Sequence, residues 1–294
     1  MQSQRIIFVV VFKVSKYMLS FVFFYLMVLF YAPAVIGTVR FVIAFVAIFS
    51  FVFNLGFNIA HLKIYPEEEN KASCIGTLLS FKVVFILISL GFYYTILLFF
   101  NFDKIITTII IIYIIEIIVQ SINTSMSNIL IADNEILKGS FPWIVISSSK
   151  IILLIIGLYI YPTNELTLAF IYLLSTIFHT LFLLPYISSY KIGRPNKRLL
   201  NKYLHYIYPL ILSNITHLVA ENIGIILINV WISSEAVAYY YAGDHLSVFR
   251  TIIPNVISLV MISMFSRNVK ENNLEKIIEL KKIAENKSEE DKNE

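Results

Sequence analysis

Long apolar stretches dominate the pattern of this chain. The run Ile105–Ile118 contains a single charged residue, Glu116, and an apolar stretch of about 20 residues is long enough to cross a bilayer as a helix. Lipid offers no partner for free backbone amides, so helices form there even from β-branched residues. The pattern therefore predicts an all-α polytopic membrane protein with about eight transmembrane helices. The expected helices cover 14–32, 38–61, 74–100, 105–131, 141–161, 165–187, 204–230 and 239–266.

Prolines and a short internal similarity divide this pattern into units. Pro33, Pro66 and Pro162 stand in the breaks between expected helices, where proline ends a helix cleanly. The stretch 33–41 aligns at a constant offset with 235–243, and each stretch opens a new helix. Parallel repeats of this kind are typical of transporters. We expect a six-helix N-terminal lobe over 1–203, the start of an incomplete second lobe over 204–267 and a polar cytoplasmic tail over 268–294.

Basic residues gather on one side of this topology, while the other side carries only Arg40 and Lys104. Because cytoplasmic loops are enriched in Lys and Arg, we predict a multi-pass protein of the cytoplasmic (plasma) membrane with both termini cytoplasmic. The first helix lacks a small-residue cleavage site after it and is interpreted as an uncleaved signal anchor. The basic residues on the predicted cytoplasmic side are Arg5, Lys13, Lys16, Lys63, Lys71, Lys138, Lys191, Arg194, Lys197, Arg198, Lys202, Arg267 and Lys270.

Composition and motifs narrow the functional classes. With 58% hydrophobic and 14% charged residues, the chain is too apolar for a soluble enzyme, since soluble domains carry about 25% charged residues. The single cysteine, Cys74, excludes an internal disulfide framework and a cysteine-rich metal site. No nucleotide, zinc or calcium motif occurs. We expect no catalytic residues, no metal, no cofactor and no nucleic acid partner.

Polar residues recur every three or four positions inside several expected helices, which places them on one helix face. Ser and Thr commonly bond neighbouring membrane helices at about 0.6 kcal/mol each, so packing is the simpler interpretation for them. Glu116, Lys150 and Glu221 lie well inside their spans. An ionisable residue there costs at least ~2.5 kcal/mol unless it meets water or a partner. For these three the pattern favours a water-filled cavity lined by the expected helices one, two, four, five, seven and eight.

Other residues within the spans leave two interpretations open. Lys82 and Arg250 either bind a ligand or form structural ion pairs with acidic residues of neighbouring helices. His179 and His217 are interpreted as hydrogen-bonded core residues rather than metal ligands. The run Tyr239-Tyr240-Tyr241 is interpreted as an aromatic belt at the membrane interface.

Short motifs around these helices resemble a known family. They are Ala34-Val35-Ile36-Gly37, Asn54-Leu55-Gly56-Phe57-Asn58, Ile75-Gly76-Thr77, and Glu221-Asn222-Ile223 followed by Ser234-Glu235-Ala236-Val237-Ala238-Tyr239-Tyr240. Over about residues 10–268 the chain is similar to Wzx-type oligosaccharide flippases, polysaccharide biosynthesis proteins of the multidrug/oligosaccharidyl-lipid/polysaccharide (MOP) exporter superfamily. That family usually has two complete six-helix lobes. This pattern gives one lobe and the first two helices of another.

The resemblance implies a flippase, not an enzyme, that moves a polyprenyl-diphosphate-linked oligosaccharide across the cytoplasmic membrane for polysaccharide or glycan assembly. Cations would hold the diphosphate, with Arg40 near the outer mouth receiving it on exit. Polar side chains would meet the sugar, and carboxylates would take up protons or Na⁺ if transport is ion-coupled. The expected substrate-cavity residues are Lys150, Lys82, Arg250, Arg40, Gln120, Asn123 and Asn54. The expected ion-coupling residues are Glu116, Glu221 and Asp244.

Three alternatives stay open. One is a cation- or proton-coupled small-molecule antiporter of the same superfamily, against which the central Lys150 argues. Another is a truncated, non-transporting remnant or assembly subunit. The third is a multi-spanning glycosyltransferase, which short outer loops disfavour. The expected partners are the lipid-linked oligosaccharide and membrane lipid, with a second chain or dimer partner as a source of the missing helices.

Overall fold

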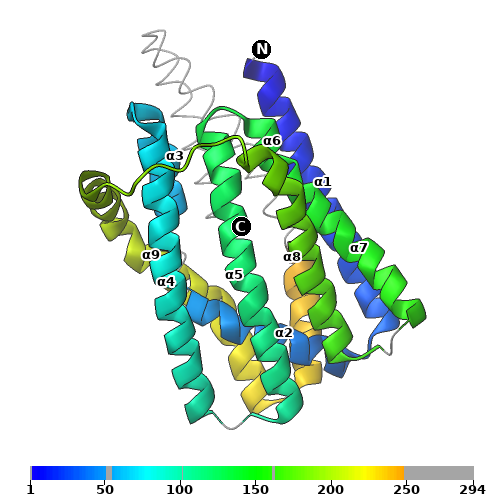
Figure 1. The fold of residues 1–294 in the computed structure, drawn as a ribbon. Helices are drawn as coiled ribbons and strands as arrows, with labels where there is room; N and C mark the ends of the chain where they lie inside the picture. Colours follow the sequence, from blue (N-terminus) through cyan, green and yellow to red (C-terminus); the bar gives the residue numbers. More distant parts are fainter. Residues whose placement is uncertain (1, 51–54, 101, 161–162, 248–294) are drawn as a thin grey trace, which may run out of the picture.

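The protein is a bundle of long helices (Figure 1). The computed structural model describes residues 2–50, 55–100, 102–160 and 163–247, and within these ranges it contains helices and no strand. This confirms the all-α fold that the apolar pattern predicted. The helices are α1 (Gln2–Phe30), α2 (Pro33–Phe49), α3 (Phe57–Glu67), α4 (Lys71–Phe99), α5 (Lys104–Ala132), α6 (Ile136–Ser140), α7 (Pro142–Ile160), α8 (Glu165–Ile187) and α9 (Lys197–Trp231), followed by the helical segment 234–247.

Five helices in the described ranges are long and apolar enough to cross a membrane. They are Lys71–Phe99, Lys104–Ala132, Ile136–Ile160, Glu165–Ile187 and Lys197–Trp231, and the shorter apolar helices Val14–Phe30 and Pro33–Phe49 accompany them. The chain is therefore a polytopic membrane protein. Most of the expected eighth helix, 239–266, and the whole tail, 268–294, lie outside the described residues.

The prediction of one continuous second helix over 38–61 was wrong. Helix α2 ends at Phe49, and α3 begins at Phe57 after Gly56, whose backbone adopts a left-handed φ of 95°. A residue in that conformation cannot continue a right-handed helix, and glycine adopts it without steric cost. The break gives α3 its own contacts, for example from His61 Nδ1 to the Tyr203 hydroxyl of α9 at 2.7 Å.

Capping side chains fix where several helices begin. Asn70 accepts a hydrogen bond from the backbone N–H of Ser73 at the start of α4, and Asn164 accepts one from Thr167 at the start of α8. Each cap accepts from a backbone amide of the first helical turn, and such amides have no hydrogen-bond partner within the helix. The sequence placed both boundaries within three residues of their observed positions, because these turns separate apolar runs.

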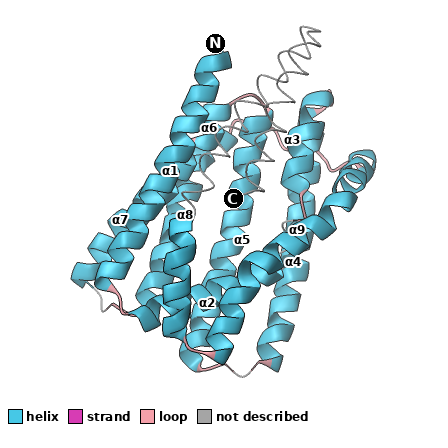
Figure 2. Cartoon of the chain, turned by 180° about the vertical axis from the view of Figure 1, so that it is seen from behind, coloured by secondary structure: helices cyan, strands magenta, loops and turns pink. Residues whose placement is uncertain are grey.

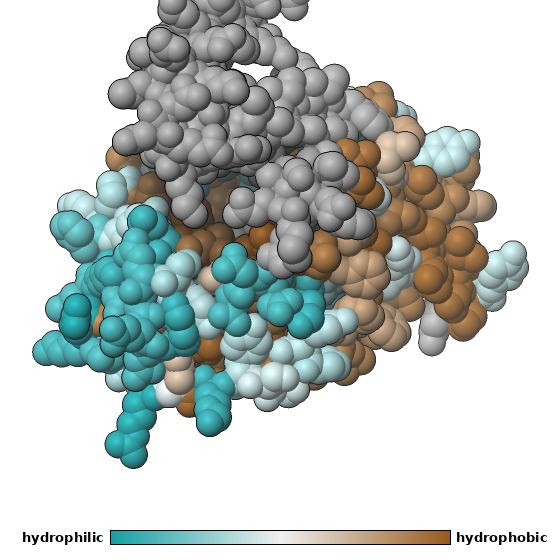
Figure 3. Space-filling model, turned by 90° about the horizontal axis from the view of Figure 1, so that it is seen from above, coloured by the Kyte–Doolittle hydropathy of each residue, from teal (hydrophilic) through white to brown (hydrophobic). Residues whose placement is uncertain are grey.

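One end of the bundle carries most of the described basic residues. The α3–α4 turn, α6 and the α8–α9 connection all lie there (Figure 1), and hydrophilic residues cover part of this end in the view from above (Figure 3). Ion pairs join Lys63 to Glu67 at 2.9 Å and Lys202 to Glu68 at 2.7 Å. The Lys63 ammonium group, by its hydrogen bond, lowers the pKa of the Glu67 carboxyl. Lys104, by contrast, begins α5 at the opposite end.

Asp133 holds three elements together at the basic end. Its two carboxylate oxygens accept hydrogen bonds from the hydroxyls of Tyr65, at 3.2 Å, and Tyr190, at 2.8 Å. Tyr65 belongs to α3, Asp133 follows α5, and Tyr190 follows α8. Hydrogen bonds to a charged acceptor are about twice as strong as neutral ones, so this cluster fixes the short helix α3 on the bundle.

Glycine allows α2 to contact the start of segment 234–247 directly. A Cβ atom built on Gly37 would lie 1.6 Å from the carbonyl oxygen of Ser234, so no larger residue fits without movement of the backbone. Seen from behind, α9 crosses the bundle obliquely (Figure 2), and it packs on α2. The buried side chains of Ala44, Ile225 and Val237 fill this interface.

We predict that Gly37→Ala destabilises the protein by about 1–3 kcal/mol, the usual cost of overpacking. The control is Gly91→Ala on α4, where the added Cβ meets nothing within 4 Å and the change favours the helix by up to ~1 kcal/mol. Thermal unfolding of the detergent-solubilised variants, followed by fluorescence-detected gel filtration, measures both. Equal melting temperatures for the two variants would contradict the close contact.

Candidate functional site

A polar cavity of about 360 Å³ lies inside the helix bundle. Helices α1, α2, α5, α7, α8 and segment 234–247 contribute its walls. The polar pattern predicted α1, α2, α5, α7 and the eighth helix as walls. It did not predict α8, and it predicted α9, from which no described residue lines the cavity. The lining residues are Lys16, Ser20, Phe23, Arg40, Gln120, Trp143, Ile146, Ser147, Lys150, Tyr172, Tyr241 and His245.

Three cations of the cavity each rest on the face of an aromatic ring. The Arg40 guanidinium carbon lies 3.5 Å from the ring centre of Tyr241. The Lys150 ammonium lies 4.2 Å from the ring centre of Tyr172. The third pair is Lys16 over Trp143, at 4.6 Å. A cation–π contact contributes about 0.5–2 kcal/mol, which offsets part of the cost of holding these charges between apolar helices.

No carboxylate lines the cavity among the described residues. Glu116 is near enough to interact electrostatically with Lys150, but no described ion pair within 4 Å joins the two. Its Oε1 atom instead accepts a hydrogen bond of 2.7 Å from the Thr176 hydroxyl. The Arg40 Nε atom is buried without a hydrogen-bond partner in the described part of the chain. A cavity with three cations and no anion of its own is suited to an anionic ligand.

The structure brings three of the predicted substrate-cavity residues together: Arg40, Gln120 and Lys150 all line the cavity. Whether Arg40 lies near the outer mouth of the cavity, as the sequence suggested, stays a prediction. Asn123 is fully buried and lies in the α5–α8 interface, where its side chain donates to the Thr176 carbonyl and accepts from Thr180. Lys82 is buried on α4 and does not line this cavity.

The predicted ion-coupling residues separate into different environments. Two of them interact electrostatically with a cation of the cavity, Glu116 with Lys150 and Asp244 with Arg40. Glu221 is exposed on α9 and pairs with His217 at 3.4 Å, so the expectation that His217 is a core residue was wrong. Asp244 is exposed on segment 234–247. His179 is fully buried beside Trp143, at 5.1 Å between ring centres, but its ring nitrogens have no hydrogen-bond partner among the described residues.

Two further predicted residues, Asn54 and Arg250, lie outside the described residues. The structure also adds cavity residues that sequence reasoning had assigned elsewhere. Tyr241 was expected in an interfacial belt, yet it is only 5% exposed and stacks on Arg40, while Tyr239 is 68% exposed. Lys16 was counted with the cytoplasmic charges. Its spacing of four from Ser20 on the same helix face was the signal that could have identified it.

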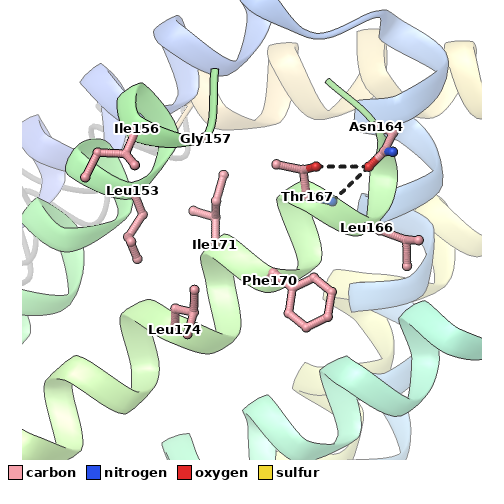
Figure 4. A pocket seen from close by; sticks show the side chains of 9 residues that line it. All are labelled: Leu153, Ile156, Gly157, Asn164, Leu166, Thr167, Phe170, Ile171 and Leu174. Carbon is pink, nitrogen blue, oxygen red and sulfur yellow. Dashed lines mark hydrogen bonds between the residues drawn. The ribbon is translucent and has the colours of Figure 1, made fainter. Parts of the chain in front are cut away.

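A second hollow, here called the α7–α8 groove, has a different character. One part of about 460 Å³ is lined by residues of both helices, including Leu153, Ile156 and Phe170. Figure 4 shows these apolar side chains and the only polar pair among them, Asn164 and Thr167, which bond each other at 3.0 Å. None of the described residues that line the groove is charged, so the groove is unsuited to an anion.

Comparison with solved structures defines the class of this fold. The structure is similar to that of a multidrug resistance transporter of the MATE family, of the MOP superfamily, in an inward-facing conformation. The TM-score is 0.63, with 15% sequence identity over 90% of this chain. The chain spans 64% of the length of that transporter. The chain therefore shares the fold of that transporter.

The family follows from the sequence itself. Residues 3–269 match the polysaccharide biosynthesis protein family, and the chain belongs to that family. No curated protein matches the chain.

The charge of the cavity can be measured with thiol reagents. The buried Cys74 is first replaced by Ser, and Ser20 is then changed to Cys at the cavity wall. We predict that an anionic methanethiosulfonate reagent reacts faster than a cationic one of similar size. Lys150→Ala should lower this ratio about five-fold, the effect of about 1 kcal/mol of Coulomb energy. A ratio that Lys150→Ala leaves unchanged would contradict a shared cationic cavity.

Proposed function

We propose that this chain acts in the translocation of a polyprenyl-diphosphate-linked oligosaccharide across the cytoplasmic membrane. The observation that carries the proposal is the cavity lined by Arg40, Lys150 and Lys16, to which the described part of the chain contributes no carboxylate. A diphosphate is a multivalent anion, and cations that donate hydrogen bonds are its usual protein partners. Membership of the polysaccharide biosynthesis family supports the same substrate class.

The rest of the cavity suits the sugar part of such a substrate. Gln120, Ser147 and Ser20 offer hydrogen-bonding groups, and aromatic rings such as Trp143 offer flat apolar faces. A volume of about 360 Å³ holds on the order of ten waters. That space accommodates a diphosphate with the first sugar, while the remaining sugars extend beyond it.

A drug-exporting antiporter is the second candidate, supported by the fold it shares with the multidrug resistance transporter. A cationic drug would be repelled by three cations in the cavity, so the lining favours an anionic substrate. The remaining alternative is that this chain does not transport on its own. Transport would then require a second copy of the chain or a partner chain. The complementation experiment below separates these candidates.

Alternating access would move segment 234–247 relative to α1 and α2. Phe24 of α1 contacts Tyr241 at 5.3 Å and His245 at 4.6 Å between ring centres. The Gly37–Ser234 approach lies at the beginning of the same segment.

We infer that the basic end of the bundle faces the cytoplasm, as the distribution of Lys and Arg indicates.

Lys150→Ala should abolish or strongly reduce glycan translocation, since it removes one of the three cations that line the cavity. The measurement is made in a strain lacking the native gene, by the amount of lipid-linked oligosaccharide that accumulates on the cytoplasmic leaflet. Lys150→Arg should retain most activity. Lys104→Ala, which removes an exposed lysine at the far end of α5, is the matched control.

The possible outcomes of this translocation experiment distinguish the candidate functions. Wild-type translocation by Lys150→Ala would overturn the diphosphate assignment. Accumulation that the wild-type chain does not reverse would support the alternative that another chain is required. An absence of accumulation in the deletion strain would favour the antiporter.

Glu116 is the strongest candidate for ion coupling because it is less exposed than Glu221 and Asp244 and interacts with a cation of the cavity. The Thr176 hydroxyl donates a hydrogen bond to Glu116, and the Lys150 ammonium interacts with it electrostatically. An anion that binds Lys150 would weaken the electrostatic hold on the Glu116 carboxylate. Proton uptake at Glu116 would then accompany substrate binding.

We predict that Glu116→Gln removes the dependence of translocation on the proton gradient while preserving the hydrogen bond from Thr176. Glu221→Gln, which changes an exposed carboxylate of α9, should retain that dependence. Translocation is followed in vesicles with and without an imposed pH gradient. An unchanged gradient response in Glu116→Gln would exclude Glu116 as the coupling residue.

A further inference from the structure

The α7–α8 groove continues along the whole outer side of the helix pair. Its second part, of about 630 Å³, runs from Phe141 past Ile152 to Phe182. Leu153 and Ile156 line both parts, so the two form one groove from the basic end to the turn that contains Asn164. Helix α7 has 19 residues and is therefore about 28 Å long, close to the thickness of the hydrocarbon core of a bilayer.

The groove begins beside the cationic cavity. Phe141 lines the groove and Trp143, two residues later, lines the cavity. Helix α1 also contacts both of these residues. Phe12 contacts Phe141 at 5.9 Å between ring centres, and Lys16, one turn further along α1, lies over Trp143.

Aromatic contacts also connect Phe141, where the cavity and the groove meet, to the α8 side of the groove. Phe141 contacts Phe182 of α8 at 5.5 Å between ring centres, and Phe182 is itself a groove residue. Helix α7 thus presents Ser147 and Lys150 to the cavity and Ser148 and Ile152 to the groove. A molecule with a charged head and an apolar tail could contact both faces of this one helix.

We propose that the α7–α8 groove binds the isoprenoid chain of the lipid whose anionic headgroup occupies the cavity. This inference rests on the proposed function. An acyl chain of an ordinary phospholipid covers one leaflet, whereas the groove extends across about two. A chain longer than one leaflet, such as a polyprenyl chain, fits that length.

The groove and the cavity also complement the two parts of such a molecule. The groove offers branched and aromatic apolar side chains, and the cavity offers cations. Binding the tail beside the cavity would hold the headgroup at a high effective concentration near Lys150 and Lys16. The two sites would then act together on one ligand.

Photo-cross-linking tests this proposal in cells that make the glycolipid. A benzophenone amino acid replaces Ile152, which is 56% exposed in the groove, or Val83, which is 57% exposed on α4. Helices α4 and α7 lie on opposite sides of the bundle in both ribbon views (Figures 1 and 2). The two positions lie at comparable depths, about 15 Å and 18 Å along their helices. The readout is the ratio of adducts with lipid-linked oligosaccharide to adducts with phospholipid.

We expect this ratio to be at least five-fold higher at Ile152 than at Val83. The added change Lys150→Ala should lower it, because the headgroup then loses one of its cations. Leu181, also 56% exposed and in the groove, provides a second position should the Ile152 variant fail to fold.

Equal ratios at groove and control positions, with translocation intact and sensitive to Lys150→Ala, would overturn the groove proposal alone. They would mean that bulk phospholipid fills the groove. A lack of glycolipid adducts at every position, together with translocation that is insensitive to Lys150→Ala, would instead refute the proposed function, and the groove proposal with it.

Discussion

The cost of holding charge away from water is the constraint on which this structure depends. A lysine or arginine in the middle of a bilayer is unfavourable by at least ~2.5 kcal/mol unless it faces water or a partner, and Arg40 and Lys150 both lie inside apolar helices. In the structure, the ring faces of Tyr241 and Tyr172 contact these two cations. These rings partly stabilise the cations without neutralising them, so the positive charge remains available to a ligand.

The cavity depends in turn on close backbone packing far from its centre. Tyr241 can reach Arg40 only because segment 234–247 lies directly against α2, and Gly37 permits that approach at Ser234. The break at Gly56 has a similar role, since it separates α3 from α2 and lets His61 meet Tyr203. Small residues at these points therefore position large aromatic and cationic side chains elsewhere.

The apolar pattern was sufficient to predict the fold class and most helix boundaries, because in lipid the backbone has few alternatives to the helix. The residues Glu165 and Ile187 were even placed as the ends of one helix, as observed. The break within 38–61 was missed because one glycine conformation, rather than the apolar pattern, decides it.

The site was partly predictable for a similar reason. Lys150, Arg40 and Gln120 were identified because polar residues are conspicuous in apolar helices. Asn123 was assigned to the substrate, although its side chain bonds α5 to α8, since helical periodicity gives a face but not the neighbour of that face. Tyr241 was misassigned because Tyr239, Tyr240 and Tyr241 look alike in sequence, and only packing shows which ring points inward.

Helix α7 connects the two chemical environments of the molecule. Its cavity face carries Lys150 and Ser147, and its groove face carries Ile152 and Ile156. A lone anion would need only the first face, and a lone hydrocarbon only the second. Since the two faces meet near Phe141 and Trp143, the arrangement favours an amphiphile that is held at both ends. Movement of α7 relative to segment 234–247 would then act on headgroup and tail together, which is what the transfer of an intact lipid between leaflets requires.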